Sequence, residues 1–175
     1  GGFANTALAL VAAATFLSAG MTVTGLDKRI ALFVLSRVGA RTNRVVLGAI
    51  LVGIVLAFLV PSTTARVACI VPIIMGIILA FGVDKRSRFA GLLMITTAQA
   101  ASIWNVGIKT AAAQNMVAIG FMEKTLKGTV TYPEWLLAAA PWAILMSIAL
   151  YFVMMKLMPP EMEEEYRKLL EALKR

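Results

Sequence analysis

The apolar residues of this chain form long runs that are separated by short clusters of charged residues. The runs cover 3–26, 45–60, 67–83, 89–104, 111–122 and 135–158. A helix that crosses a bilayer needs about 20 apolar residues, at about 1.5 Å of rise per residue. The pattern therefore predicts an all-α membrane protein built as one membrane unit, with little room for a separate soluble domain.

Two neighbouring runs are shorter than a full span. Residues 45–60 and 67–83 would each form a helix of roughly 24 Å, against a hydrocarbon core of about 30 Å. Basic residues flank the pair on both sides: Arg41, Arg44, Lys85, Arg86 and Arg88. Basic loops favour the cytoplasmic side, so both ends of the pair are expected there. We predict a re-entrant hairpin over 45–83 with its tip at 61–66; the alternative is a full span followed by a span kinked at Pro61.

The following apolar segment, 89–122, is interrupted near its middle. Asn105 and Gly107 are weak helix formers and Lys109 is charged, so a broken transmembrane helix is expected here. The stretch 123–133 is predicted to be an external loop. Residues 134–158 then return as a transmembrane helix, with Trp135 and Trp142 towards its outer half and Lys156 at its inner end.

The two ends of the chain complete the predicted organisation. Residues 3–26 are expected to form a span that ends at Asp27, Lys28 and Arg29, and residues 30–44 a helix at the cytoplasmic interface, because this stretch is short and basic. Residues 159–175 change character after Pro159-Pro160 and predict an amphipathic interfacial helix. Because the chain opens at Gly1-Gly2-Phe3 inside an apolar run, without Met or a basic leader, we expect a piece of a longer polypeptide.

Composition agrees with a membrane location and excludes several functions. Hydrophobic residues make up 60% of the chain and charged residues 15%, against about 45–50% and 25% in soluble proteins. The net charge of +8 comes mainly from the ends of apolar runs, which argues against nucleic-acid binding. The chain has no His and no nucleotide or metal-binding motif, so an enzyme is not expected. The single Cys69 lies in an apolar run and predicts a buried, inert thiol.

Two cations are expected deep in the membrane. Arg66 lies in the predicted hairpin tip and Lys109 in the predicted break, whereas the acidic residues of this part of the chain stand at the edges of spans. Burying an unpaired cation costs at least about 2.5 to 3.5 kcal/mol. The missing negative charge is therefore expected from another segment of the full chain or from a bound anion.

Helix ends near these cations favour an anion. The returning helix of the hairpin would present free backbone N–H groups at 62–65, where Ser and Thr hydroxyls can also donate. Discontinuous helices that meet at the membrane midplane are typical of secondary transporters. The candidate substrate-binding residues are Ser62, Thr63, Thr64, Arg66, Asn105, Lys109 and Thr110. Helix capping, snorkelling of the cations, or their pairing with acidic residues elsewhere in the chain remain alternatives.

Three stretches resemble the divalent anion/sodium symporter family, a group of dicarboxylate and tricarboxylate transporters and exchangers. The segment "GLDKRIAL" (25–32) resembles the family's junction between a helix and the arm. The segment "NRVVLGAILVGIVLAFLVPSTTARVACIVPI" (43–73) resembles its inward-opening hairpin, and "AASIWNVGIKTAAAQN" (100–115) resembles its broken fifth helix. The resemblance covers nearly the whole chain in the right order.

The resemblance implies a first structural repeat without its first three helices, and an inverted second repeat outside this sequence. It implies that 1–44 comprises a scaffold helix (1–26) and an interfacial arm helix (27–44). It also implies that 45–158 is half of a moving transport domain, made of the hairpin 45–83, the broken helix 89–122 and the helix 134–158. It also implies a homodimer in membrane lipid that works by an elevator motion. The expected location is an integral protein of the bacterial inner membrane.

The hairpin departs from the family's Ser-Asn-Thr motif, because Thr63 stands between Ser62 and Thr64. In sodium-coupled members, this tip and the break of the fifth helix hold a sodium ion, so the implied sodium-binding residues are Ser62, Thr63 and Gly107. Two fixed cations near such a site would repel sodium and could replace its charge. We therefore hypothesise sodium-independent exchange of di- or tricarboxylates, since an empty carrier would leave the positive charge uncompensated.

Two other functions stay open at this point. The first is sodium-coupled dicarboxylate symport, for which hydroxyl and carbonyl oxygens at the tip would suffice. The second, of another class, is a structural subunit of a membrane complex in which Arg66 and Lys109 pair with acidic residues of a partner. No cofactor is expected apart from a sodium ion, and the substrate is not narrowed among succinate, malate, 2-oxoglutarate, citrate and tartrate.

Overall fold

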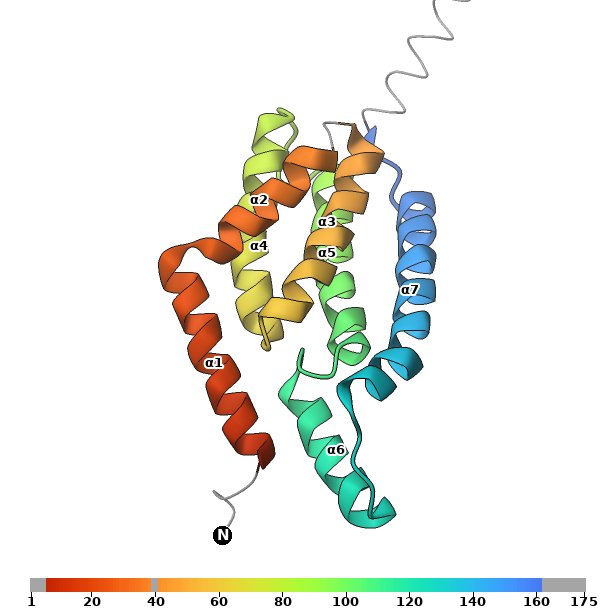
Figure 1. The fold of residues 1–175 in the computed structure, drawn as a ribbon. Helices are drawn as coiled ribbons and strands as arrows, with labels where there is room; N and C mark the ends of the chain where they lie inside the picture. Colours follow the sequence, from red (N-terminus) through yellow and green to blue (C-terminus); the bar gives the residue numbers. More distant parts are fainter. Residues whose placement is uncertain (1–5, 39–40, 162–175) are drawn as a thin grey trace, which may run out of the picture.

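The computed structural model describes residues 6–38 and 41–161, and within these ranges it contains seven helices and no strand (Figure 1). The helices are α1 (Thr6–Thr24), α2 (Leu26–Val38), α3 (Thr42–Leu59), α4 (Thr63–Ala80), α5 (Arg88–Gly107), α6 (Ala113–Leu126) and α7 (Tyr132–Leu157). The all-α prediction is confirmed. All but the first three residues of the helix predicted over 159–175 lie outside the described residues.

α3 and α4 form a hairpin whose turn spans 60–62. Val60 is extended, as is usual before a proline, and Pro61 cannot continue the helix. The Ser62 hydroxyl then accepts a hydrogen bond from the Ala65 backbone N–H at 3.4 Å and caps α4. α3 begins, and α4 ends, towards the same end of the molecule (Figure 1).

The predicted arm lengths need correction. Each helix has 18 residues rather than about 16, because α3 begins at Thr42 and α4 begins directly at Thr63. Asn43 and Arg44 are polar but still helical, so the apolar run understated the length of α3. At this length α3 qualifies as a candidate span. The α4 arm counts among the shorter apolar helices of the described residues. The length of α3 therefore does not support re-entry, which stays a prediction.

α5 lies at the centre of the packing and contacts α3, α4 and α7. Its inner face buries Phe89, Leu92 and Leu93 completely. Where α5 crosses α3, Gly53 faces Ala100 so closely that a Cβ on the glycine would lie 3.4 Å from that of Ala100. Small residues thus let the two backbones approach each other within the core.

The break in the second half of the chain is observed between Gly107 and Ala113. α5 ends at the level of the α3–α4 turn, and α6 continues away from it (Figure 1). The predicted external loop, 123–133, is shorter than expected, because α6 extends to Leu126 and α7 begins at Tyr132. Lys127, with a φ of 51°, ends α6 in the left-handed conformation.

The arm is shorter than predicted, and it buries an acidic residue. The helix α2 ends at Val38 and not at 44, and Gly25, with a φ of 65°, forms the bend between α1 and α2. Asp27 lies just after the end of α1, at the edge of the first apolar run as expected, but it is buried there, at only 3% exposure. Its carboxylate accepts from the Lys28 backbone N–H at 2.7 Å and lies within hydrogen-bonding reach of the Cys69 thiol. The buried position of Cys69 itself is as predicted.

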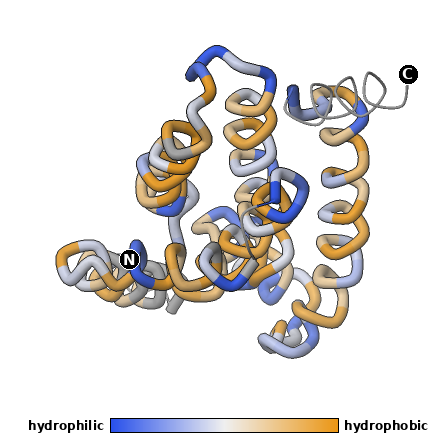
Figure 2. Tube along the Cα trace, turned by 90° about the horizontal axis from the view of Figure 1, so that it is seen from above, coloured by the Kyte–Doolittle hydropathy of each residue, from blue (hydrophilic) through white to orange (hydrophobic). Residues whose placement is uncertain are grey.

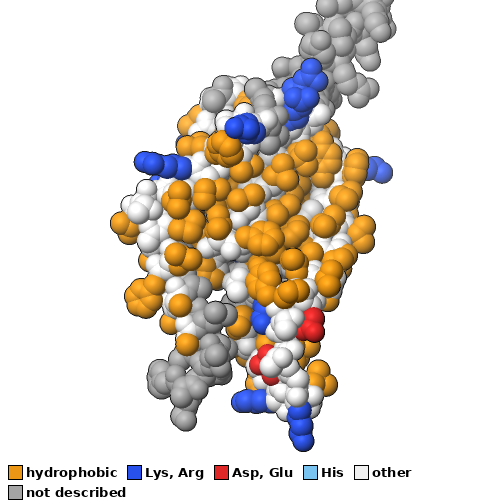
Figure 3. All heavy atoms as spheres, in the orientation of Figure 1, with side chains coloured by type: hydrophobic (Ala, Val, Ile, Leu, Met, Phe, Trp, Pro, Cys, Tyr) orange, Lys and Arg blue, Asp and Glu red, His pale blue; other side chains and the backbone are white. Residues whose placement is uncertain are grey.

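The surface is consistent with a bilayer. Among the described residues, α3, α5 and α7 are long and apolar enough to cross a membrane. Apolar side chains cover the middle of the molecule, and charged side chains gather mainly towards its two ends (Figure 3). Viewed from above, hydrophobic residues dominate most helices and hydrophilic residues concentrate in connections and helix ends (Figure 2).

Candidate ion and substrate site at the hairpin tip

The hairpin tip contacts the end of α5 through a hydrogen bond. The Thr63 hydroxyl, in the first turn of α4, donates to Asn105 Oδ1 at 2.7 Å. The two residues are 42 positions apart in sequence, and the turn and the break bring them together. Thus two of the predicted site residues, on two elements that the sequence placed at the site, are in contact.

Arg66 lies behind this contact and is fully buried, at 0% exposure. One guanidinium nitrogen, Nη2, donates to Asn105 Oδ1, to the Thr63 hydroxyl at 3.3 Å and to the Ala111 carbonyl oxygen at 3.5 Å. The three acceptor atoms are the oxygens of a side-chain amide, a hydroxyl and a backbone carbonyl. Hard metal cations bind oxygen ligands of the same kinds. A tethered positive charge therefore occupies an oxygen-lined position between the tip and the break.

The rest of the Arg66 guanidinium has no such partners. Nε and Nη1 are buried and form no hydrogen bond with the described residues. The described part of the chain also offers Arg66 no ion pair, since the pair found there joins Arg88 to Glu161. A buried cation without a carboxylate is costly, so the charge requires compensation from outside the described residues.

The tip itself presents donors towards a groove. Thr63 and Thr64 are the first two residues of α4, so their backbone N–H groups have no acceptor within the helix. Thr64 is exposed. A groove of about 530 Å³ runs from these two residues along α4, lined by Thr63, Thr64, Val67, Ala68, Val71 and Pro72. The first turn of α4 can therefore donate to an anion that enters this groove.

Lys109 is placed differently from Arg66. It lies in the connection between α5 and α6, and its ammonium donates to the carbonyl oxygen of Val130 in the loop before α7. The Val130 backbone N–H in turn donates to Glu123 Oε1 at 3.0 Å. Lys109 therefore holds the α6–α7 loop, and its role in substrate binding stays a prediction.

The remaining predicted site residues lie around the break. Thr110 is half-buried and Gly107 is buried. A Cβ on Gly107 would lie 2.9 Å from both the Ala143 side chain and the Trp104 ring, so only glycine fits there without a shift. The structure thus gives Gly107 a packing role, and its carbonyl remains a predicted sodium ligand.

Two residues that were not predicted as site residues satisfy the carbonyl groups freed by the break. Asn115 Nδ2 donates to the Asn105 carbonyl at 2.6 Å and to the Ile108 carbonyl at 3.0 Å. Trp135 Nε1 donates to the Val106 carbonyl at 2.9 Å. An asparagine shortly after a break was a usable signal for such capping, whereas the tryptophan, at the start of the next span, was not.

Comparison with known sequences identifies the family. A family model described as the sodium:sulfate symporter transmembrane region matches residues 1–172. The chain belongs to this family. The symporter resemblance drawn from the hairpin and the broken helix is thereby confirmed.

Relatives of the chain are bacterial. A protein named "Membrane protein" from Cupriavidus necator is 62% identical over 160 residues, covering 91% of this chain and 31% of the relative. L-tartrate/succinate antiporters of Escherichia coli K12 and Shigella flexneri are each 30% identical over 164 residues, covering 91% of this chain and 34% of each relative. The chain therefore spans about a third of the length of the relatives it matches.

Membership in this family has two direct consequences. It places the chain with transport proteins rather than enzymes, in agreement with the expectation from the sequence. It also makes the chain part of an integral membrane protein, in agreement with its apolar helices. The bacterial relatives fit an inner-membrane location.

Proposed function

We propose that this chain is part of a secondary transporter that exchanges dicarboxylate or tricarboxylate anions without sodium. The observation that carries the proposal is the position of Arg66. Its Nη2 lies among three oxygen acceptors at the meeting point of two helix ends, and no described carboxylate neutralises it. A fixed cation in this position would supply the positive charge that a sodium ion could otherwise bring to an anionic substrate.

The substrate in this proposal binds at the first turn of α4. The free N–H groups of Thr63 and Thr64 and the exposed Thr64 hydroxyl would donate to one carboxylate. Dicarboxylates are favoured because related proteins are named L-tartrate/succinate antiporters. A tricarboxylate such as citrate would need additional donors from the rest of the protein.

Exchange follows from the cost of an empty carrier. Arg66 keeps its charge in the absence of substrate, and two of its nitrogens have no partner among the described residues. Moving that uncompensated charge through the membrane is unfavourable, so the loaded form should cross more readily than the empty one. Outward movement of one anion would then be needed for inward movement of another.

The proposal includes the division of the chain expected from its sequence. Residues 1–44 would serve as scaffold and arm, 45–158 as half of a moving domain with a re-entrant hairpin, and 159–175 as an interfacial segment. The resemblance to the symporter family supports the elevator motion and the homodimer in membrane lipid. The turn of the hairpin lies level with the end of α5, whereas α6 continues beyond it, which supports re-entry (Figure 1).

Sodium-coupled symport is the second candidate, because the family model is named after a sodium:sulfate symporter. Gly107 and the hydroxyls of Ser62 and Thr63 would then contribute to a sodium site. Arg66 already donates to the Thr63 hydroxyl at 3.3 Å, which places positive charge beside this position. Sodium would have to bind against that repulsion, so exchange is the stronger proposal.

Uptake into proteoliposomes containing the full-length protein decides between the two. Labelled succinate is added outside, with unlabelled succinate or no dicarboxylate inside, and with sodium or potassium as the external cation. Exchange predicts uptake that requires internal dicarboxylate and is equal in both salts. Uptake that needs a sodium gradient and no internal anion would overturn the proposal in favour of symport.

A further inference from the structure

The helix α2 exposes apolar side chains although it is too short to cross a bilayer. Its 13 residues give about 20 Å of helix, against a hydrocarbon core of about 30 Å. One face packs on α3 and α4 and buries Ala31 completely. Leu32 and Phe33 remain outside this contact, at 54% and 57% exposure. Apolar residues on the free face of a short basic helix are typical of the interface between lipid headgroups and acyl chains.

Three arginines gather where α2 ends and α3 begins, at the end of the molecule that also holds the α4–α5 loop (Figure 1). Arg37, Arg41 and Arg44 are all exposed, and none of them forms an ion pair within the described part of the chain. The Arg37 guanidinium lies 4.6 Å from the centre of the Phe33 ring. This contact holds one cation directly against the exposed apolar face of α2. A ligand with both a negative charge and an apolar portion would fit the two features together.

The neighbouring basic loop lacks this combination. Lys85 and Arg86, between α4 and α5, are exposed but directly follow the exposed carboxylate of Asp84. None of the described residues of this loop is an exposed large apolar residue. A general attraction to an anionic membrane surface would act on both places, because both lie at the same end of the molecule. The apolar face beside the arginines therefore distinguishes the end of α2 from the loop.

We infer that the end of α2 and the start of α3 form a binding surface for an anionic phospholipid. Guanidinium groups suit phosphate oxygens, because their N–H donors are arranged in pairs. The three arginines contact the headgroup phosphate, and Leu32 and Phe33 lie beside the upper part of the acyl chains. A free phosphate ion would use the arginines only. The inference is independent of the transported substrate, because it concerns the outer face of the arm and not the hairpin tip.

Thermal unfolding of the purified full-length protein in a nonionic detergent tests the inference. Phosphatidylglycerol is titrated in, with phosphatidylcholine of the same acyl chains as the reference lipid. We expect phosphatidylglycerol to raise the melting temperature and phosphatidylcholine to leave it nearly unchanged. The double variant Arg37→Gln/Arg41→Gln should need about 25-fold more phosphatidylglycerol for the same rise, since each basic residue near an anionic lipid surface contributes about fivefold. Both side chains are exposed, so the variant should fold.

Lys85→Gln/Arg86→Gln is the matched control, because it removes two exposed cations from the same end of the molecule. It should keep the wild-type response to phosphatidylglycerol. An equal loss in both double variants would overturn the inference in favour of a general attraction between charges. Equal effects of the two lipids on the wild-type protein, or a full effect of inorganic phosphate alone, would also overturn it.

A second variant, Arg37→Lys/Arg41→Lys, separates lipid binding from a role in folding. It keeps both charges, so its response to phosphatidylglycerol should fall much less than that of the glutamine variant. An equal loss of response in the two variants would show that these arginines support the fold of the arm, and would overturn the inference.

Discussion

Arg66 and Lys109 are two cations that the sequence presents as equivalent, and the structure separates them. Arg66 is fully buried, and a single nitrogen of its guanidinium meets three oxygen acceptors between the tip and the break. Lys109 is half-buried, and its ammonium holds one backbone carbonyl of the α6–α7 loop. Arg66 thus belongs to the contact between the hairpin tip and the break after α5. Lys109 instead holds the α6–α7 loop in place.

The difference teaches that depth and partners decide what a charge does. A side chain that keeps contact with solvent loses little hydration, and its charge is screened. The positive charge of a guanidinium without solvent contact is screened very little. Leaving its Nε and Nη1 without hydrogen-bond acceptors costs free energy unless another group compensates for it. Arg66 is therefore the stronger candidate for attracting an anion, and the comparison can be tested by changing each residue in turn.

The largest effect is expected from Arg66→Met, which removes the charge and keeps much of the volume. Three oxygen acceptors lose their shared donor, and the fixed positive charge disappears. Exchange of succinate in proteoliposomes is expected to fall about 100-fold, in line with the loss of several charge-assisted hydrogen bonds. Arg86→Met, in the exposed α4–α5 loop, is the control and should exchange at the wild-type rate. Retained exchange in Arg66→Met would contradict the proposed role.

Asn105→Asp is expected to lower exchange less than Arg66→Met does. It distinguishes a role of the Arg66 charge in folding from a role in anion binding. The new carboxylate keeps the acceptor for Thr63 and Arg66 but neutralises the guanidinium. The melting temperature should therefore stay the same or rise, while exchange falls about tenfold because the anion site loses its net positive charge. Thr129→Asp, which adds the same charge in the exposed α6–α7 loop, should change neither measurement. Full exchange in Asn105→Asp would show that the charge of Arg66 serves folding only.

The smallest effect is expected from Lys109→Met. It removes one hydrogen bond to the Val130 carbonyl, which costs about 1 kcal/mol of stability, and leaves the tip unchanged. A slightly lower melting temperature and less than about a threefold loss of exchange are expected. Lys124→Met, an exposed lysine on α6, provides the comparison. A loss as large as that of Arg66→Met would show that both cations serve the anion, as the sequence alone suggested.

The helices could be predicted because their causes are local. Apolar runs, Pro61 with its following hydroxyls, and the weak helix formers around Gly107 are visible in the sequence, and the hairpin turn and the break lie where these residues stand. The ends of the helices were harder to predict than the helices themselves. Polar residues such as Asn43 and Glu123 extend a helix past the end of its apolar run when no proline or glycine stops it. Burial of Asp27 depends on packing against α4, which no local pattern records.

The candidate site was predictable in its elements but not in its pairings. The sequence placed Thr63, Arg66 and Asn105 near one another, since both helix ends were expected to meet. It did not indicate that the Ala111 carbonyl completes the surroundings of Arg66, or that Lys109 turns to Val130. Such contacts depend on side-chain directions after the elements have packed, and neither spacing nor composition carries that information.

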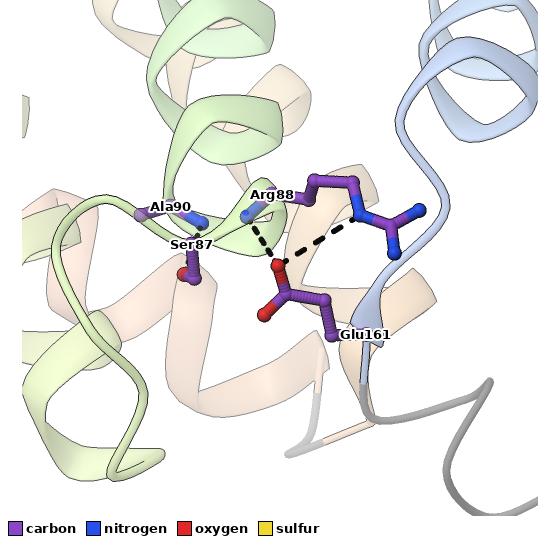
Figure 4. A network of polar contacts seen from close by, with 4 residues as sticks. All are labelled: Ser87, Arg88, Ala90 and Glu161. Carbon is purple, nitrogen blue, oxygen red and sulfur yellow. Dashed lines mark hydrogen bonds and ion pairs between the residues drawn. The ribbon is translucent and has the colours of Figure 1, made fainter.

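Two side-chain hydrogen bonds join the antiparallel helices α5 and α7, and a third bond joins the start of α5 to Glu161, just beyond the end of α7. At one end the Arg88 backbone N–H donates to Glu161 at 2.9 Å, beside the Ser87 cap of α5 (Figure 4). Further along, Trp104 donates to Ser147 at 2.9 Å, and at the other end Trp135 donates to the Val106 carbonyl. Sliding one helix along the other would break both bonds between the helices together. Spin labels on α5 and α7 should therefore keep one distance through the transport cycle, so that labels on α1 and α2, in the proposed scaffold and arm, can report displacement relative to this pair.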